Sequence, residues 1–548
     1  MKSYREALYD LCSKKRFILC VSLLALIAYG FAVTNATLYV DTLENDRYVG
    51  SGQDMLQAGR FTMTLVANLV GFVGTEAQNE STLEILSILG LILAGVNLCI
   101  LFRRICGSAL TDNACLVFVC VFLTYPLYVE LWPYTGGMLM VSFGQVFSSY
   151  ALLLIYSVLH DGKPRQWGRL ALASGLMMLV CAGYEAVVPV YIASVFAVLF
   201  LQVVYPKGKE RRVREILRQG LYYAAVLAVG LILRLAVHRV LLWVFHLTAK
   251  ANGATLFVWG EQPFSEVLKN LAATIYMSYI LNAMINFPIT ELLVAGIVLL
   301  LILLVGCWKF GPSILLPGAG MYLSLILLSL VQGSVSPYRT CHVFALFVAF
   351  VLMYLVMLVE SMPGKRLRPI ALCLCVYLCF QQARYVNYFA TINNLRAEEE
   401  AFVLRTVGTD LQKNNALEKP LVFLGGHPLS SFLEESGSIP ENSFRWGNYW
   451  DYYDSKDYFP PYSATRFIHQ TAMQSVFTWG VVAFDQEGLQ HLFHYYGFEI
   501  SIPESEDILE YYRFALDYAQ ENQMPSYPMD GYIQDIGDII VVNMESTH

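Results

Sequence analysis

Long runs of mostly apolar residues are the feature that most limits what this chain can fold into. A helix needs ~20 such residues to cross a bilayer. The run 170–205 has 36 residues and basic clusters on both flanks, so it is counted as two spans, which makes eleven in total. The predicted fold class is mostly α: a polytopic membrane bundle of about 11 spans with a small C-terminal α/β domain. The spans are expected at 17–40, 83–102, 113–129, 137–159, 170–184, 186–205, 220–245, 291–308, 313–332, 341–360 and 369–388.

Clusters of Lys and Arg predict how the chain is threaded, because basic residues favour the cytoplasmic side of short loops. With eleven spans, every cluster falls on the side of the N-terminus, which predicts a cytoplasmic N-terminus and an extracytoplasmic C-terminus. The alternative is that residues 271–290 form a twelfth span, which would move the C-terminus inside. The clusters are Lys14 to Arg16, Arg103 with Arg104, Lys163 to Arg169, Lys207 to Arg218, Lys309, and Lys365 to Arg368.

Charge also divides the chain into two predicted domains, 1–390 and 391–548. The first holds 28 Lys and Arg against 19 Asp and Glu, whereas the second holds 8 against 24. The membrane domain is thus basic and the tail acidic, and nothing in this distribution supports nucleic-acid binding. All 12 cysteines lie before residue 380, which excludes a disulfide-stapled tail domain.

The tail and the first outer loop carry weaker secondary-structure signals. Strands are expected at 420–424, 476–484 and 538–542, and helices at 396–416 and 504–522. The aromatic-rich segment 444–463 is either packed surface or a carbohydrate-stacking loop. Residues 57–73 place apolar side chains on one helical face, a pattern typical of a helix lying at the membrane interface.

The first outer loop concentrates carboxylates just after the first span. Asp41, Glu44 and Asp46 lie there, together with Arg47. A carboxylate at the membrane–water boundary can act as a general base on a sugar hydroxyl, and nearby arginines tune its pKa. Asp41 is the preferred base because it is the first residue out of the bilayer.

Arginines near the outer boundary are candidates for binding a phosphate, because guanidinium grips it with two parallel hydrogen bonds. Arg60 lies in the first outer loop, and Arg339 precedes the tenth span. Arg234 falls inside an apolar run, where a charge is costly. It needs a partner there, either Glu185 from the neighbouring turn or a lipid phosphate.

Three short motifs resemble the bacterial serotype-conversion glucosyltransferases of the type II Gtr family. They are Asp41-Thr-Leu followed by Gly59-Arg60-Phe61, then Gly183-Tyr184-Glu185-Ala186, and Pro337-Tyr338-Arg339. The family's paired acids are replaced here by Asp41-Thr42, with Glu44 and Asp46 following, so the identity of the base stays open.

The resemblance implies a GT-C type glycosyltransferase of the bacterial plasma membrane. Such an enzyme moves a sugar, which the family's pattern leads us to expect is glucose, from a polyprenyl-phosphate donor to a polysaccharide acceptor at the outer face. On this reading Asp41, Asp46 or Glu44 is catalytic. The residues expected to bind the donor phosphate are Arg60, Arg339 and Arg234. The residues expected to bind the substrate are Tyr184, Glu185 and Arg47.

Two other function classes compete with a transferase: a flippase or transporter of a lipid-linked saccharide, and a simple anchor for the tail. A transporter usually shows repeated halves, which we do not find, and an anchor does not need eleven spans. The expected partners are the lipid-linked donor, the polysaccharide acceptor and membrane lipid. No cofactor is implied. A divalent metal stays open, but we assign no metal ligand, and His491 with His494 is read as a surface pair.

Overall fold

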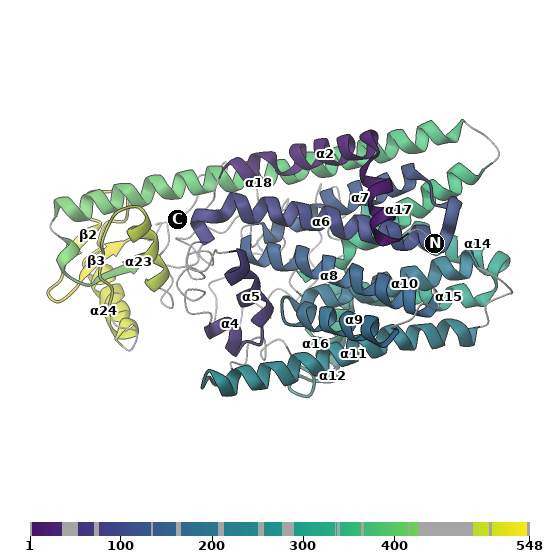
Figure 1. Ribbon diagram of the computed structural model, residues 1–548. Coiled ribbons are helices and arrows are strands. Elements are labelled where there is room, and N and C mark those ends of the chain that lie inside the picture. The colour runs from purple at the N-terminus through teal and green to yellow at the C-terminus, as the bar shows by residue number, and fades with distance from the viewer. Residues whose placement is uncertain are drawn as a thin grey trace.

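The computed structural model describes residues 3–35, 53–70, 76–132, 135–160, 166–206, 213–249, 257–276, 290–334, 336, 340–362, 366–414, 416–425, 486–503 and 507–544. Within these ranges the chain forms a bundle of long helices with a small sheet domain beyond one end (Figure 1). The N-terminal helix α1 (Tyr4–Cys12) lies at the opposite end of the bundle.

Eight helical segments of the described ranges are long and apolar enough to cross a membrane, so this is a membrane protein. Their apolar runs match eight of the predicted spans. They are built on α2 (Lys15–Thr34), α6 (Glu76–Cys106), α8 (Thr135–His160), α10 (Val188–Val204), α11 (Val213–Val244), α14 (Thr290–Phe310), α17 (Val343–Ser361) and α18 (Leu367–Lys413).

The other three predicted spans are helical but shorter than a full crossing. Helix α7 (Asp112–Thr124) has 13 residues and α9 (Gln166–Cys181) has 16. At 1.5 Å per residue these cover ~20–24 Å of a ~30 Å hydrocarbon core. The third is split at Ile326 into α15 (Leu315–Leu325) and α16 (Leu327–Gln332). Three of the eleven predicted spans are therefore not matched by a single helix of full membrane-spanning length.

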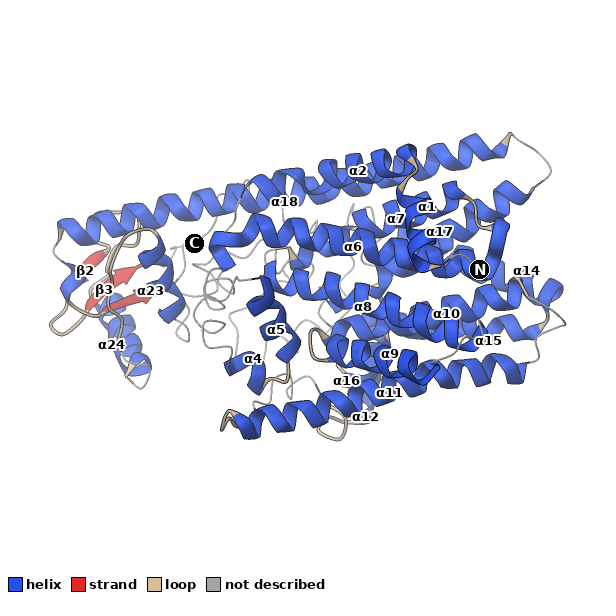
Figure 2. Cartoon of the chain, in the orientation of Figure 1, coloured by secondary structure: helices blue, strands red, loops and turns tan. Residues whose placement is uncertain are grey.

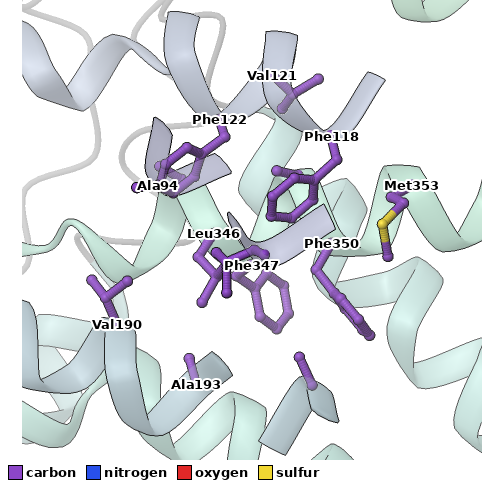
Figure 3. Packing of buried hydrophobic residues seen from close by; sticks show 14 of the residues in the cluster. Ala94, Phe118, Val121, Phe122, Val190, Ala193, Leu346, Phe347, Phe350 and Met353 are labelled. Carbon is purple, nitrogen blue, oxygen red and sulfur yellow. The ribbon is translucent and has the colours of Figure 1, made fainter. Parts of the chain in front are cut away.

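The centre of the bundle is packed with aromatic side chains from α6, α7, α10 and α17. Phe102 meets Phe118 edge-on with ring centroids 5.5 Å apart, and Phe350 lies edge-on to both Phe102 and Phe200. Figure 3 shows Phe118, Phe122 and Phe350 from neighbouring helices around this core. Helix α11 instead exposes much of its apolar surface, including Leu221 and Ile232, as expected of a helix that faces lipid.

The predicted interfacial helix over 57–73 is wrong in its extent. The structure has two short helices instead, α4 (Gln53–Gln57) and α5 (Phe61–Val70), separated at Gly59 (Figure 2). Gly59 has a φ of 73°, a left-handed conformation that a continuous helix does not contain. The apolar periodicity runs through this position, but the backbone turns there.

Helix α18 continues without a break through the predicted domain boundary at 390/391. Its 47 residues measure ~70 Å, about twice the thickness of the hydrocarbon core. Its C-terminal part enters the core of the tail domain through Val403, Leu404 and Val407, which pack with Phe423 and Phe493. The net charge of the chain changes from basic to acidic near residue 391, whereas the helical backbone of α18 continues through this position.

The described part of the tail is a three-stranded sheet with flanking helices. The strands are β1 (Leu421–Leu424), β2 (Ile533–Asp535) and β3 (Ile540–Asn543), in the order β1-β3-β2. Strand β3 pairs parallel to β1 and antiparallel to β2. Two expected strands are thus present, and β2 was not predicted. The helices are α23 (Gln486–Tyr495) and α24 (Ile508–Glu521).

Several predictions lie wholly or partly outside the described residues. Helix α12 (Phe264–Tyr276) covers the start of the proposed twelfth span, and 277–289 are not described. The strand expected at 476–484 and the aromatic segment 444–463 lie wholly outside the described residues.

Candidate active site

Four predicted site residues lie together beside the α4–α5 turn, at the end of the bundle nearer the sheet domain (Figure 1): Arg60, Tyr184, Glu185 and Arg234. Glu185, in the turn between α9 and α10, receives two guanidinium groups on its two carboxylate oxygens. Arg234 Nη2 of α11 is 3.4 Å from Oε1, and Arg60 Nη2 is 3.6 Å from Oε2. The pairing of Arg234 with Glu185 was one of two partners predicted for this arginine, whereas the second arginine on the same carboxylate was not expected.

Gly59 allows the α4–α5 turn to approach Arg234 closely. A Cβ atom at this position would stand 2.7 Å from Arg234 Nη2, which is too short for a real contact, and 3.1 Å from His238 Nδ1, which is unusually tight. The turn also presents the carbonyl oxygen of Ala58 to Arg234 Nη2 at 3.5 Å. The Gly-Arg pair of the motif thus has a physical reason: glycine supplies the turn and the space, and Arg60 follows it.

Two hydrogen bonds join α5 to the turn that carries Glu185. The backbone N–H of Thr62 donates to the carbonyl oxygen of Ala182 at 3.0 Å, and its Oγ1 donates to that of Leu179 at 2.9 Å. The turn itself begins where α9 ends at Cys181. These bonds hold Arg60 beside Glu185, although the two residues are far apart in the chain.

Three neighbouring rings, which we call the ring stack, lie beside Arg60, and two of them are nearly parallel. The guanidinium carbon of Arg60 is 5.7 Å from the ring centroid of Tyr184, within the range of a cation–π contact. Tyr184 in turn contacts the ring of His342 with the two ring planes tilted by 58°. His342 stacks on Tyr128 with centroids 6.0 Å apart and planes 10° from parallel. His342 is fully buried, so the stack supports Tyr184 from inside the bundle.

The charges of this cluster favour an anion. Two guanidinium groups share one carboxylate, so the three side chains carry a formal charge of +1. Both N–O distances are longer than the ~2.7–2.9 Å of strong charged hydrogen bonds. The side chains of Arg60 and Arg234 are 33% and 20% exposed, so they can contact a ligand that approaches the cluster.

The remaining predicted site residues lie outside the described ranges. Asp41, Glu44, Asp46 and Arg47 belong to the segment 36–52, and Arg339 belongs to 337–339. The last described residue before the first segment is Asn35, and the first described residue after the second segment is Thr340. Arg339 is three positions before His342 in the sequence.

Sequence reasoning missed Tyr128 and the structural role of His342. His342 was visible only as a polar residue near the start of a span, and its ring stack depends on three segments that are distant in sequence.

For metal binding, no group of three or more His, Cys, Asp or Glu side chains comes together in the described part of the chain. His494 pairs with Glu499 at 2.6 Å.

A comparison with protein families decides what kind of protein carries this cluster. Residues 30–357, more than half of the chain, match the family model Glucosyl transferase GtrII. The chain belongs to this family. The predicted resemblance is therefore confirmed, and the protein is a glycosyltransferase. No curated protein sequence matches the chain significantly.

Every residue of the cluster lies inside the matched range of this glycosyltransferase. The match ends in α17, before the long helix α18 and the sheet domain. The family relationship therefore covers the arginine cluster and the ring stack, and it does not extend to the tail.

Proposed function

We propose that this glycosyltransferase moves glucose from a polyprenyl-phosphate donor to a polysaccharide at the outer face of the bacterial plasma membrane. The observation that carries the proposal is the pair Arg60 and Arg234 around Glu185, at one end of a membrane bundle. A lipid-linked donor carries its phosphate at the headgroup level. Fixed guanidinium groups at that level match its charge and its bidentate geometry.

The arrangement of the bundle supports an outward-facing site. The α4–α5 turn lies at the end nearer the sheet domain, and α1 lies at the other end (Figure 1). Basic residues gather at the α1 end: Lys14 and Arg103 each pair with Asp112 at 2.6 Å. By the positive-inside rule that end is cytoplasmic. The cluster and the tail domain are then extracytoplasmic.

The proposed reaction needs a base, an acceptor hydroxyl and a stabilised leaving group. Asp41 accepts the proton of the acceptor hydroxyl, whose oxygen forms a bond to C1 of the donor sugar. The bond between C1 and the phosphate oxygen breaks, and its electron pair leaves with the polyprenyl phosphate. General-base catalysis of this kind contributes ~10²–10⁴-fold to the rate. Glu44 and Asp46 are the alternative bases.

The arginines stabilise the charge that develops on the leaving phosphate. Because their contacts with Glu185 are long, Arg60 and Arg234 can turn toward a phosphate without breaking a tight ion pair. Arg339 is the third proposed phosphate ligand. Tyr184, Glu185 and Arg47 are proposed to position the sugar, with Tyr184 held by its contacts to Arg60 and His342.

The test is sugar transfer by the full-length protein in nanodiscs, with radiolabelled polyprenyl-phosphate glucose and surface polysaccharide. Asp41→Asn removes the base at nearly constant shape and should lower transfer by ~10²–10⁴-fold. Glu266→Gln, on α12, is the control and should keep normal transfer. If Asp41→Asn is active and Asp46→Asn or Glu44→Gln is not, the base is one of the latter. Donor that crosses the bilayer without any sugar transfer would favour a flippase.

The orientation has its own test. Protease added to sealed spheroplasts should remove residues 391–548 and leave the loop at 207–218 intact. Protection of the tail, together with cleavage of that loop, would reverse the proposed topology. Protection of both the tail and the loop would favour a twelfth span.

A further inference from the structure

A cavity of about 720 Å³ lies between the outer part of α18 and the end of α23. Its volume is within the ~300–1,000 Å³ of sites that bind small molecules. One wall is a single face of α18 that runs from Asn394 to Lys413, and the other is formed by Tyr495 and Tyr496. Neither the family match nor the proposed site includes these residues.

The two faces of α18 differ sharply along this stretch. Val403, Leu404 and Val407 are buried in the core of the tail domain, which fixes the helix. On the cavity side, Phe402 is 68% exposed, and Tyr495 opposite is 54% exposed. Exposed aromatic rings on a fixed helix keep their faces available to a ligand with little loss of conformational freedom on binding.

Polar groups alternate with these rings. Thr406 and Thr409 donate their hydroxyls to backbone carbonyls of their own helix, and the oxygen of Thr409 can still accept a hydrogen bond. Arg405 lies over the ring of Tyr496, with its guanidinium carbon 5.2 Å from the centroid. Asn394 donates to Glu398 at 2.8 Å. Ring faces combined with donors and acceptors suit a sugar, which has both apolar C–H faces and hydroxyl groups.

The formal charges of the residues that line the cavity give no net attraction for a strongly charged ligand. Two acidic side chains, Glu398 and Asp410, balance two basic ones, Arg405 and Lys413, among the residues that line it. A balanced lining provides hydrogen bonds without a net field, which suits a neutral polyhydroxy chain better than a nucleic acid or an anionic headgroup.

The position of the cavity along α18 agrees with a site just outside the hydrocarbon core of the membrane. Asn394 stands 27 positions after Leu367, the first residue of α18, which is ~40 Å along the helix. The hydrocarbon core is only ~30 Å thick. The cavity therefore begins just beyond the membrane, on the same helix that packs against α2 within the bundle.

From these observations we infer that the α18–α23 cavity binds the acceptor polysaccharide as a short stretch of neutral sugar units and holds it close to the membrane surface. The inference rests on the proposed function, since it names the acceptor of that reaction. Phe402 and Tyr495 stack on sugar faces, and the polar residues between them bind hydroxyls.

The experiment uses the full-length protein in nanodiscs with saturating donor and varied delipidated surface polysaccharide. Phe402→Ala and Tyr495→Ala should each raise the KM for polysaccharide about two- to tenfold, and the double variant more, with the effect on KM rather than kcat. Both rings are exposed, so folding should be kept. Phe514→Ala, which removes an exposed ring from α24, is the matched control and should leave KM unchanged.

An unchanged KM in the double variant would overturn the inference. If the wild type transfers no sugar, the proposed function fails, and calorimetric binding of the same polysaccharide to the nanodisc-bound protein decides the inference alone. Binding by the wild type and loss of binding in the double variant would support the cavity as a glycan site. Equal binding by both, or none by the wild type, would contradict it.

Discussion

Arg234 Nη2 lies 3.4 Å from Glu185 Oε1, and this contact joins α11 to the turn between α9 and α10. Arg60 reaches the other oxygen of the same carboxylate. Glu185 is therefore the point at which three separate segments of the chain meet. Changes at this meeting point, or in the residues that support it, should alter both stability and donor binding.

Loss of Arg234 should affect stability. Arg234→Ala leaves Glu185 with Arg60 as its remaining described partner, and because Glu185 is 46% exposed, we expect a modest loss of ~1–2 kcal/mol in the free energy of unfolding. Thermal unfolding in nanodiscs measures it. Arg239→Ala, an exposed arginine on the same helix, should change little. If Arg234→Ala keeps full stability and loses only donor affinity, Arg234 acts on the ligand alone.

Gly59→Ala should displace Arg234 without removing it. The new Cβ would stand 2.7 Å from Arg234 Nη2, on a backbone with φ of 73°. The left-handed conformation alone costs ~1–2 kcal/mol for a residue other than glycine, and the clash moves the guanidinium. We expect lower stability and weaker donor binding. Gly175→Ala is the control, since a Cβ atom added there would meet no other atom within 4 Å; similar behaviour of the two variants would contradict this role of Gly59.

His342 is predicted to act by packing. His342→Ala leaves a void between Tyr128 and Tyr184 and should cost ~2–4 kcal/mol in the free energy of unfolding. The release of Tyr184 should also weaken donor binding. His342→Phe fills most of this space, so it should restore both properties. A folded His342→Phe protein with normal donor binding and no sugar transfer would assign the imidazole a chemical role instead.

Some of these relationships could be predicted from the sequence because a single physical requirement decides them. A guanidinium within an apolar run needs a partner, and Glu185 was a nearby candidate on a predicted turn. Apolar runs of sufficient length likewise predicted the long helices. The strands β1 and β3 were visible as short apolar runs, whereas β2 spans three residues and gives no periodic signal.

Other features depend on contacts that no local pattern contains. The apolar spacing around Gly59 fits one helix, but the approach of Arg234 and His238 requires a turn. The stack of Tyr128, His342 and Tyr184 needs three distant segments. The change of charge near residue 391 indicated two bodies, yet charged residues are good helix formers, so α18 continues across it.

The most direct test of the central claim, that the arginine pair around Glu185 binds the donor phosphate, is the affinity of the nanodisc-bound protein for polyprenyl-phosphate glucose. Arg60→Ala should weaken this affinity by ~10- to 100-fold, as expected for the loss of a hydrogen bond to a charged group. Arg60→Lys keeps the charge but not the bidentate grip and should be intermediate, while Arg239→Ala should bind as the wild type does. An unchanged affinity in a folded Arg60→Ala protein would contradict the claim.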